Sequence, residues 1–396
     1  MSVSYWQDKS FSSPLKKFDL IIIGGGIMGV SLAYWLSKEK GLKIALVEKN
    51  ELASGASGRN AGFLISGTSE YYKRSLSHWG KEKTKIIWQM TQENHRLLRE
   101  EIIKKNKVEC DYKKCGSFLV ACTELEFQEV VESTQLLKED GFNLEIVEKE
   151  ELTKRLKSKN FYGGCLNPED GELDPVKLIE GMAKILPSNV EIFEHNEVME
   201  INQNENLEVI IKTNKNIFNS PMAVLATNAY SKLLDNFFAE KVFPTRGQVL
   251  VTEPINLELF EGKVIYADYG YEYFRQLPNK RILVGGFRQQ YAQTEIGFSD
   301  ETTGDIQEGL YNFLIEHFPQ TQGIKITHRW AGLMGFSVDG MPLIGSLPKY
   351  PNIIASVGFT GHGMAFGFVL GKGLAEQILT GKSSYPLNIF SIKRFL

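Results

Sequence analysis

Cysteine is scarce in this 396-residue sequence, and none of the four cysteines forms a C-x-x-C motif. So few cysteines exclude a disulfide-stabilised framework, and no nearby histidine completes a zinc site. We expect reduced, packed thiols and no metal centre. The four are Cys110, Cys115, Cys122 and Cys165.

An excess of charge of one sign is also missing. The 45 Lys and Arg residues are balanced by 48 Asp and Glu residues, which gives a net charge of −3. Because no long block of like charges occurs, the electrostatic signature of a nucleic-acid or membrane-surface protein is absent. We therefore expect no nucleic-acid partner, and the sequence carries no signal for an oligomeric state.

Long apolar runs are lacking as well. The longest, residues 20–36, is interrupted by four glycines and by Ser31 and Tyr34. It is too short and too rich in glycine for a membrane span. The first 17 residues show no apolar core of a signal peptide. We expect a cytoplasmic protein without a membrane span.

Glycine, in contrast, is abundant and unevenly placed. Nine of the 36 glycines fall in residues 20–70 and eleven in residues 330–381. Such clusters indicate close backbone approach or unusual backbone angles near both ends of the chain. The length and the 42% hydrophobic content indicate a globular protein of two or three domains.

The first glycine cluster follows a buried strand predicted over residues 18–23. Gly24 allows a tight turn, Gly26 lets backbone N–H groups approach a pyrophosphate, and Gly29 lets the next helix pack on the strand. The N-terminus of that helix would stabilise an anion. Glu48, at the end of a second strand, can accept hydrogen bonds from ribose hydroxyls and would repel the 2′-phosphate of NADP. The pattern predicts a dinucleotide site and leaves NAD and FAD open.

Residues 53–64 follow as a long stretch of small residues with many exposed N–H donors. A flat ring system could lie against such a backbone, whereas a flexible surface loop is the alternative interpretation. A second glycine loop, residues 358–363, precedes a helix expected from Met364 to Thr380.

Together with further motifs, these segments resemble the FAD-dependent D-amino acid oxidase family, which includes glycine oxidase, sarcosine oxidase and γ-glutamylputrescine oxidase. The other matching segments are residues 225–230, 244–248, 273–275 with 285–286, 330–333, 339–345, 358–363 and the tail 390–395.

The resemblance implies bound FAD and assigns contacts to it. Residues 331–336, where some members carry a cysteine bonded to the flavin, contain no cysteine, so we expect non-covalent FAD. The cofactor-binding residues that it implies are Gly24, Gly26, Ile27, Met28, Gly29, Glu48, Lys49, Ser57, Arg59, Asn60, Ala61, Gly62, Phe63, Val198, Thr227, Gly361, His362, Gly363 and Met364. For the lone His362 we favour contact with the flavin, and a hydrogen-bonding spacer and an acid/base role are the alternatives.

The resemblance also implies the fold class, α/β with an α+β substrate domain. A Rossmann-like FAD-binding domain of glutathione-reductase type would cover residues 1–80, 156–235 and 336–396. An interleaved substrate domain with an antiparallel sheet would cover residues 81–155 and 236–335.

The implied reaction is oxidation of the C–N bond of an amine or amino acid to an imine, with a secondary amine or N-substituted amino acid favoured. Oxygen would then accept the electrons and give hydrogen peroxide. A dehydrogenase that uses a quinone or a protein acceptor, a tRNA-modifying flavoprotein and a flavoprotein that only binds its ligand remain alternatives.

The substrate carboxylate lacks its usual partner in this sequence. The positions at which family members carry an arginine or lysine are Met334 and Ala365. Arg275 and Arg288 are candidate replacements, and strand alternation places Tyr271, Tyr273 and Arg275 on one face of the sheet. Alternatively, the aromatic residues belong to the core and the arginines to the surface. Arg59 could also reach the reactive face of the flavin or only position the backbone.

Overall fold

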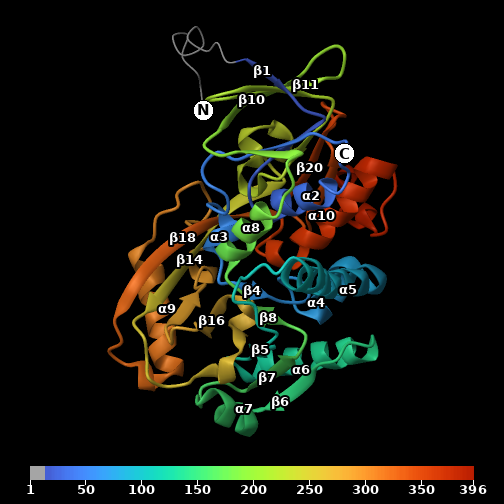
Figure 1. The fold of residues 1–396 in the computed structure, drawn as a ribbon. Helices are drawn as coiled ribbons and strands as arrows, with labels where there is room; N and C mark the ends of the chain where they lie inside the picture. Colours follow the sequence, from blue (N-terminus) through green and yellow to red (C-terminus); the bar gives the residue numbers. More distant parts are fainter. Residues whose placement is uncertain (1–13) are drawn as a thin grey trace.

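The computed structural model describes residues 14–396. A four-stranded sheet lies at one end of the molecule, an eight-stranded sheet at the other, and a six-stranded sheet between them (Figure 1). This mixture of helices and sheets confirms the predicted α/β class. The predicted cofactor domain begins at residue 1, so its first 13 residues lie outside the described part.

The six-stranded sheet contains the predicted β-α-β unit. Its strands are parallel except β19, which runs antiparallel to β20. β2 is buried along its whole length, which explains its continuous aliphatic sequence. In sheet order the strands are β19 (Leu343–Ser346), β20 (Ile353–Val357), β13 (Ala223–Leu225), β2 (Leu20–Ile23), β3 (Ile44–Val47) and β9 (Val190–Phe193).

Two apolar helices, α2 (Ile27–Leu36) and α10 (Gly363–Thr380), pack against each other beside this sheet. Every residue of α2 is buried, so this helix is apolar all round. The close approach of the two helices depends on Gly371, where an added side-chain carbon would lie 2.9 Å from Cβ of Ser31. As predicted, α10 stops at Gly381, whose φ of 74° is left-handed.

A third helix, α5 (Lys81–Leu97), continues directly as a π-helical segment, η1 (Leu98–Lys105). Oδ1 of Asn94 accepts 3.0 Å hydrogen bonds from the N–H groups of Phe368 and Val369. These bonds tie α5 to α10 of the cofactor side, although α5 falls within the segment predicted for the substrate domain.

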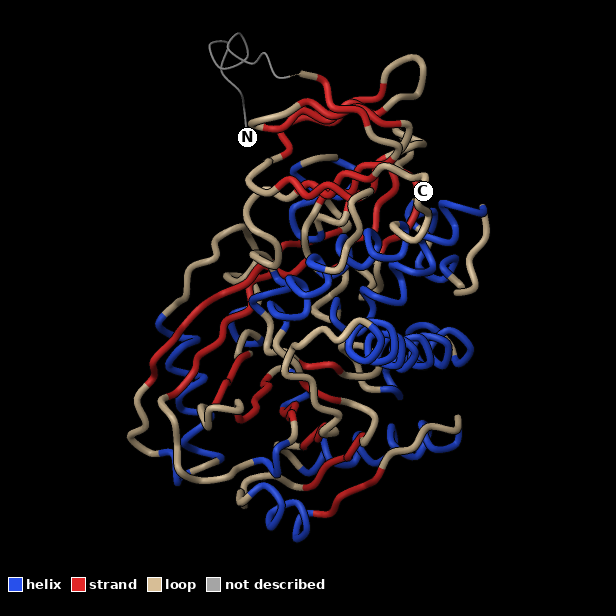
Figure 2. The backbone as a smooth tube through the Cα atoms, in the orientation of Figure 1, coloured by secondary structure: helices blue, strands red, loops and turns tan. Residues whose placement is uncertain are grey.

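The eight-stranded sheet is antiparallel except for the parallel pair β5 and β15. The two longest strands, β14 and β18, run side by side (Figure 2). In sheet order the strands are β18 (Ile326–Ser337), β14 (Val242–Thr252), β17 (Ile282–Gly285), β16 (Glu272–Gln276), β15 (Val264–Ala267), β5 (Ser117–Val120), β7 (Gly163–Asn167) and β6 (Glu145–Glu148).

The remaining strands form two smaller sheets. The four-stranded sheet has the order β1 (Leu15–Lys17), β12 (Ile217–Ser220), β11 (Val209–Thr213) and β10 (Val198–Gln203), and β4 (Phe63–Leu64) pairs with β8 (Gly171–Glu172). The other α-helices are α3 (Ala56–Arg59), α4 (Tyr72–Trp79), α6 (Glu124–Glu139), α7 (Lys149–Leu156), α8 (Pro175–Lys184) and α9 (Gly304–His317). Asp174 caps α8, since its side chain accepts hydrogen bonds from the N–H groups of Val176 and Lys177.

The sheets alternate along the chain, as interleaved domains require, but one predicted boundary differs from the sheet topology. β7 pairs with β5 and β6 in the eight-stranded sheet, whereas residues 156–235 were assigned to the cofactor domain. The division into two domains stays a prediction. No helix in residues 14–396 is both long and apolar enough to cross a membrane.

Candidate functional site

The turn between β2 and α2 has the geometry that its glycines predict. Gly24 has a φ of 115°, a backbone angle that residues other than glycine rarely adopt. A side-chain carbon at Gly29 would overlap the carbonyl oxygen of Gly24, so only glycine lets α2 pack this closely on the strand. Gly26, the N-cap residue of α2, has no side chain to cap the helix, and the Ser57 hydroxyl takes only the Ile27 N–H. The other N–H groups of the first turn are therefore available to an anion.

Glu48 stands beside this turn, as predicted, at the end of β3. Its Oε2 accepts a 2.7 Å hydrogen bond from the Gly25 N–H, and its Oε1 accepts one of 3.0 Å from the Asn50 N–H. The Ser57 hydroxyl accepts a 2.9 Å bond from the Ile27 N–H. The turn, the acid after β3 and the small-residue stretch thus form one connected surface.

The small-residue stretch is ordered by its own polar groups. The side-chain amide of Asn60 donates to the Ser57 carbonyl over 2.6 Å, and its Oδ1 accepts from the Gly62 N–H over 2.7 Å. Arg59 donates to the carbonyls of Ser54 and Ala331 at 3.0 and 2.9 Å. It also forms a 3.0 Å ion pair with Asp300. These contacts tie the Arg59 guanidinium to two backbone carbonyls and to Asp300, and its role at the flavin stays a prediction.

The second glycine loop precedes α10, with Gly361 at a φ of 79° and the non-glycine Thr360 at 48°. No side chain caps α10 at His362. Burial lowers the pKa of His362 to about 4, and its Nδ1 lies 3.2 Å from the Thr360 carbonyl oxygen. This histidine is therefore neutral at physiological pH.

One cavity of about 530 Å³ brings the predicted segments together. Residues Arg59 to Ala61 and Phe63 line it from the first segment, and Gly361, His362 and Met364 line it from the second. The eight-stranded sheet contributes Tyr273 and Met334, and Arg288 comes from the segment that follows β17. Residues more than 200 positions apart in the sequence thus face one space.

Two glycines, Gly247 of β14 and Gly361 of the second glycine loop, show how closely these side chains meet. A side-chain carbon at Gly247 would lie 2.8 Å from Cε of Met334 and 3.8 Å from the Tyr273 hydroxyl. One at Gly361 would lie 3.6 Å from Sδ of Met334. The second glycine loop, Met334 and Tyr273 are therefore neighbours across the cavity.

The two candidate arginines differ in position. Arg275 is buried, donates to the Gly62 carbonyl over 3.2 Å, and pairs with Glu172 at 3.3 Å. It is not among the residues that line the cavity, so its prediction as a substrate residue does not fit the structure. Arg288 does line the cavity.

Arg288 keeps its charge available to the cavity. Its guanidinium carbon lies 5.4 Å from the ring centre of Tyr271 and 5.3 Å from that of Phe336. Among residues 14–396, no carboxylate forms an ion pair with it. Stacking between two rings holds the side chain without neutralising it.

Val198, Lys49 and Thr227, all predicted cofactor residues, do not line the cavity. Val198 begins β10, and the Lys49 ammonium lies 3.6 Å from the ring centre of Tyr230. Thr227 is close to the glycine turn, since a side-chain carbon at Gly24 would lie 3.4 Å from its backbone nitrogen. Their contacts with a cofactor stay predictions.

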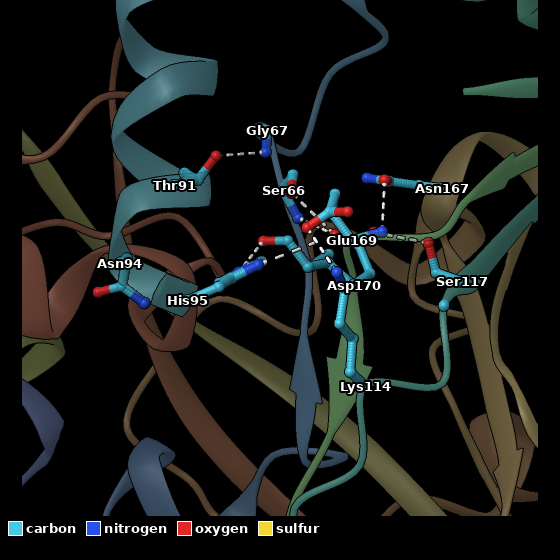
Figure 3. A network of polar contacts seen from close by, with 12 residues as sticks. Ser66, Gly67, Thr91, Asn94, His95, Lys114, Ser117, Asn167, Glu169 and Asp170 are labelled. Atoms are coloured by element: carbon cyan, nitrogen blue, oxygen red, sulfur yellow. Dashed lines mark hydrogen bonds and ion pairs between the residues drawn. The ribbon is translucent and has the colours of Figure 1, made fainter. Parts of the chain in front are cut away.

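Asp170, which sequence patterns did not single out, lies at the centre of a buried polar network (Figure 3). Its carboxylate accepts 2.8 Å bonds from the N–H and hydroxyl of Ser66 and a 2.6 Å bond from the hydroxyl of Ser117. Burial raises the pKa of Asp170 to about 7 and lowers that of His95, 4.0 Å away, to about 3. Asp170 also lines the cavity, yet its Asp-Gly pair predicts only a turn.

Comparison with known proteins agrees with this geometry. The chain is 26% identical to γ-glutamylputrescine oxidoreductase of Escherichia coli over 91% of this chain and 83% of that protein. Glycine oxidase from Geobacillus kaustophilus has the same fold, with a TM-score of 0.82, 20% identity and coverage of 96% and 99%. L-proline dehydrogenase from P. horikoshii superposes with a TM-score of 0.81, 22% identity and coverage of 96% and 98%. The family model for FAD-dependent oxidoreductases (DAO) matches residues 19–377, and the chain therefore belongs to this family.

Proposed function

We propose that this FAD-dependent enzyme oxidises the C–N bond of an amine that carries a carboxylate, with N-substituted amino acids as the favoured substrates. The substrate would lose two electrons and two protons to become an imine, which water hydrolyses. Bound FAD would supply the redox chemistry by accepting the electrons, and oxygen would be reduced to hydrogen peroxide.

The residues present fit non-covalent FAD. The Gly24–Gly29 turn and the open N-terminus of α2 suit a pyrophosphate, and Glu48 suits a ribose. The cavity between residues 59–63 and residues 361–364 suits a flat ring. The positive end of α10 faces the same space and would stabilise negative charge on that ring.

Arg288 is the observation that carries the substrate proposal. It is a cation that has no carboxylate partner among residues 14–396, and it is stacked between Tyr271 and Phe336 on the wall of the cavity. Its planar guanidinium suits a carboxylate bound through two hydrogen bonds. It would replace the anchors that are apolar here, at Met334 and Ala365.

The protonation states of Tyr273 and His362 determine which hydrogen bonds and charges the substrate amine would meet. Burial raises the pKa of Tyr273, so its hydroxyl keeps its proton and can donate a hydrogen bond to the substrate. The neutral His362 brings no positive charge against an amine. Since the amine must be uncharged to be oxidised, we expect the rate to rise with pH until the amine is deprotonated.

The names of related proteins support both parts of the proposal. Glycine oxidase and γ-glutamylputrescine oxidoreductase are names of relatives that act on an amino acid and on an amine conjugate. A quinone or protein acceptor remains the alternative to oxygen, because L-proline dehydrogenase has the same fold.

An anaerobic reduction screen tests the proposal. Holoenzyme is mixed without oxygen with paired amines that differ only in a carboxylate, and the loss of visible flavin absorbance is followed. We expect reduction by N-alkyl amino acids and much slower reduction by the matching amines without a carboxylate. Failure of every amine to reduce the flavin would refute the proposal, and oxygen uptake during turnover separates the two acceptors.

A further inference from the structure

We propose that Glu272 holds a proton at neutral pH, which it shares with Asp268, and that this acid pair, bridged by Gln289, positions Arg288 over the substrate cavity. Glu272 is thus a positioning residue for carboxylate binding. The inference rests on the proposed function, in which Arg288 anchors the substrate.

The acid pair is joined by one side-chain amide. Nε2 of Gln289 donates to Oδ2 of Asp268 over 2.8 Å and to Oε1 of Glu272 over 3.0 Å. Glu272 is only 1% exposed. The two carboxyl groups also lie within hydrogen-bonding reach of each other.

Two oxygens in this cluster lack a donor when Glu272 is treated as a carboxylate. They are Oε2 of Glu272 and Oε1 of Gln289, and both are buried. Buried acceptors without partners are rare because each loses its hydration without compensation. A proton on Oε2 of Glu272 removes the unpaired charge and turns this oxygen into a donor for Asp268, whereas Oε1 of Gln289 gains no partner from it.

The electrostatic surroundings favour that proton. Burial is the largest influence and, with the nearby Asp268, raises the pKa of Glu272 to about 8 against the opposing effects of Gln289 and Arg288. The other titratable groups that face it are Tyr273 and Cys122, whose raised pKa values keep them protonated in the same range.

The acid pair affects Arg288 in two ways, through the backbone that Gln289 holds in place and through the charge of Glu272. Gln289 directly follows Arg288 and begins the short helix η6 (Gln289–Tyr291), so its bridge fixes the backbone that carries the guanidinium. A neutral Glu272 also leaves Arg288 free for a substrate carboxylate. Once Glu272 loses its proton, its charge competes for Arg288, and carboxylate binding weakens as pH rises.

Acetate binding to the holoenzyme tests this coupling, because acetate has a carboxylate but no amine that titrates. Dissociation constants are measured between pH 6.5 and 9 from the change in flavin absorbance. With a pKa of about 8, only about a tenth of Glu272 is protonated at pH 9, so the wild-type constant should rise roughly tenfold.

Two variants and a control distinguish the effect of the Glu272 proton from the effect of the Gln289 bridge. Glu272→Gln carries no titratable proton and should bind acetate with the same constant across this range. Gln289→Ala should weaken binding at every pH, whereas Gln290→Ala, at the exposed neighbour, should match the wild type. The same tenfold rise in Glu272→Gln would overturn the proposal and point to another group, such as Asp170.

Unfolding by denaturant provides a second readout that needs no ligand. Since the folded state binds the Glu272 proton more tightly than the unfolded chain does, wild-type stability should fall between pH 5 and 8 relative to Glu272→Gln. Parallel curves would show that Glu272 has no shifted proton. If the curves diverge as expected but acetate binds at no pH, Glu272 is protonated in the folded protein and the proposed role of Arg288 is refuted.

Discussion

Replacement of Arg288 by methionine is the most informative single change in the substrate cavity. The substitution keeps an apolar stem between Tyr271 and Phe336 and removes only the charge. A guanidinium–carboxylate pair makes two charge-assisted hydrogen bonds, each worth about 1.5–3 kcal/mol. Arg288 is half-buried, so we take the low end for each bond, about 3 kcal/mol in total, or a factor of roughly 150.

The assay is anaerobic stopped-flow reduction over a range of substrate concentrations, which separates binding from the reduction rate. For a substrate with a carboxylate, we expect the roughly 150-fold loss mainly in the dissociation constant. For the matching amine without a carboxylate, the variant and the wild type should be equal. Arg281→Met is the control, because Arg281 donates to the Thr252 carbonyl and the Thr327 hydroxyl outside the cavity.

Two results would refute this reasoning. An Arg288→Met enzyme with unchanged affinity would show that the carboxylate binds elsewhere. An equal loss for substrates with and without a carboxylate would show that Arg288 only maintains the shape of the cavity.

Three further predictions concern the cofactor site and the buried network. Gly29→Ala forces a side-chain carbon onto the Gly24 carbonyl, so it should destabilise the fold by about 1–3 kcal/mol and weaken FAD binding. Gly55 has open space around it, so Gly55→Ala is the control and should have neither effect. Thermal melting measures the stability, and FAD titration measures the binding. Glu48→Gln should raise the FAD dissociation constant roughly tenfold, measured by flavin fluorescence, because a charged acceptor becomes a neutral one; an unchanged constant would remove Glu48 from the ribose site. The raised pKa of Asp170, about 7, means that wild-type stability should fall as pH rises from about 4 to about 7, by up to roughly 1.4 kcal/mol per pH unit, and denaturant curves of Asp170→Asn should lack this slope.

Local sequence signals predicted the parts of the fold that depend on neighbouring residues. The glycines of residues 24–29 act through their own backbone angles and through contact with the adjoining helix. Asp174 before Pro175, and Gly381 after the last helix, mark helix ends because capping involves only the nearest turn. The predicted boundaries of these elements were confirmed to within a few residues.

Contacts between distant segments could not be predicted from the sequence. Strand alternation places Tyr273 and Arg275 on one face, but it does not show where the cavity ends on that face. Glu172, on the β4–β8 ribbon, pairs with Arg275 from about 100 positions away and removes it from the site. The bridge between Gln289 and Glu272 also lies beyond the reach of sequence patterns, because it depends on how η6 folds back on β16.

The most direct test of the central claim is a stoichiometric anaerobic titration. Holoenzyme is titrated with an N-alkyl amino acid that reduces it in the screen, and the carbonyl product is counted against the flavin that has lost its colour. We predict one carbonyl product for each flavin reduced, which is the balance for oxidation of a C–N bond to an imine that hydrolyses. Flavin that stays oxidised, or loses its colour without forming a carbonyl product, would contradict the account.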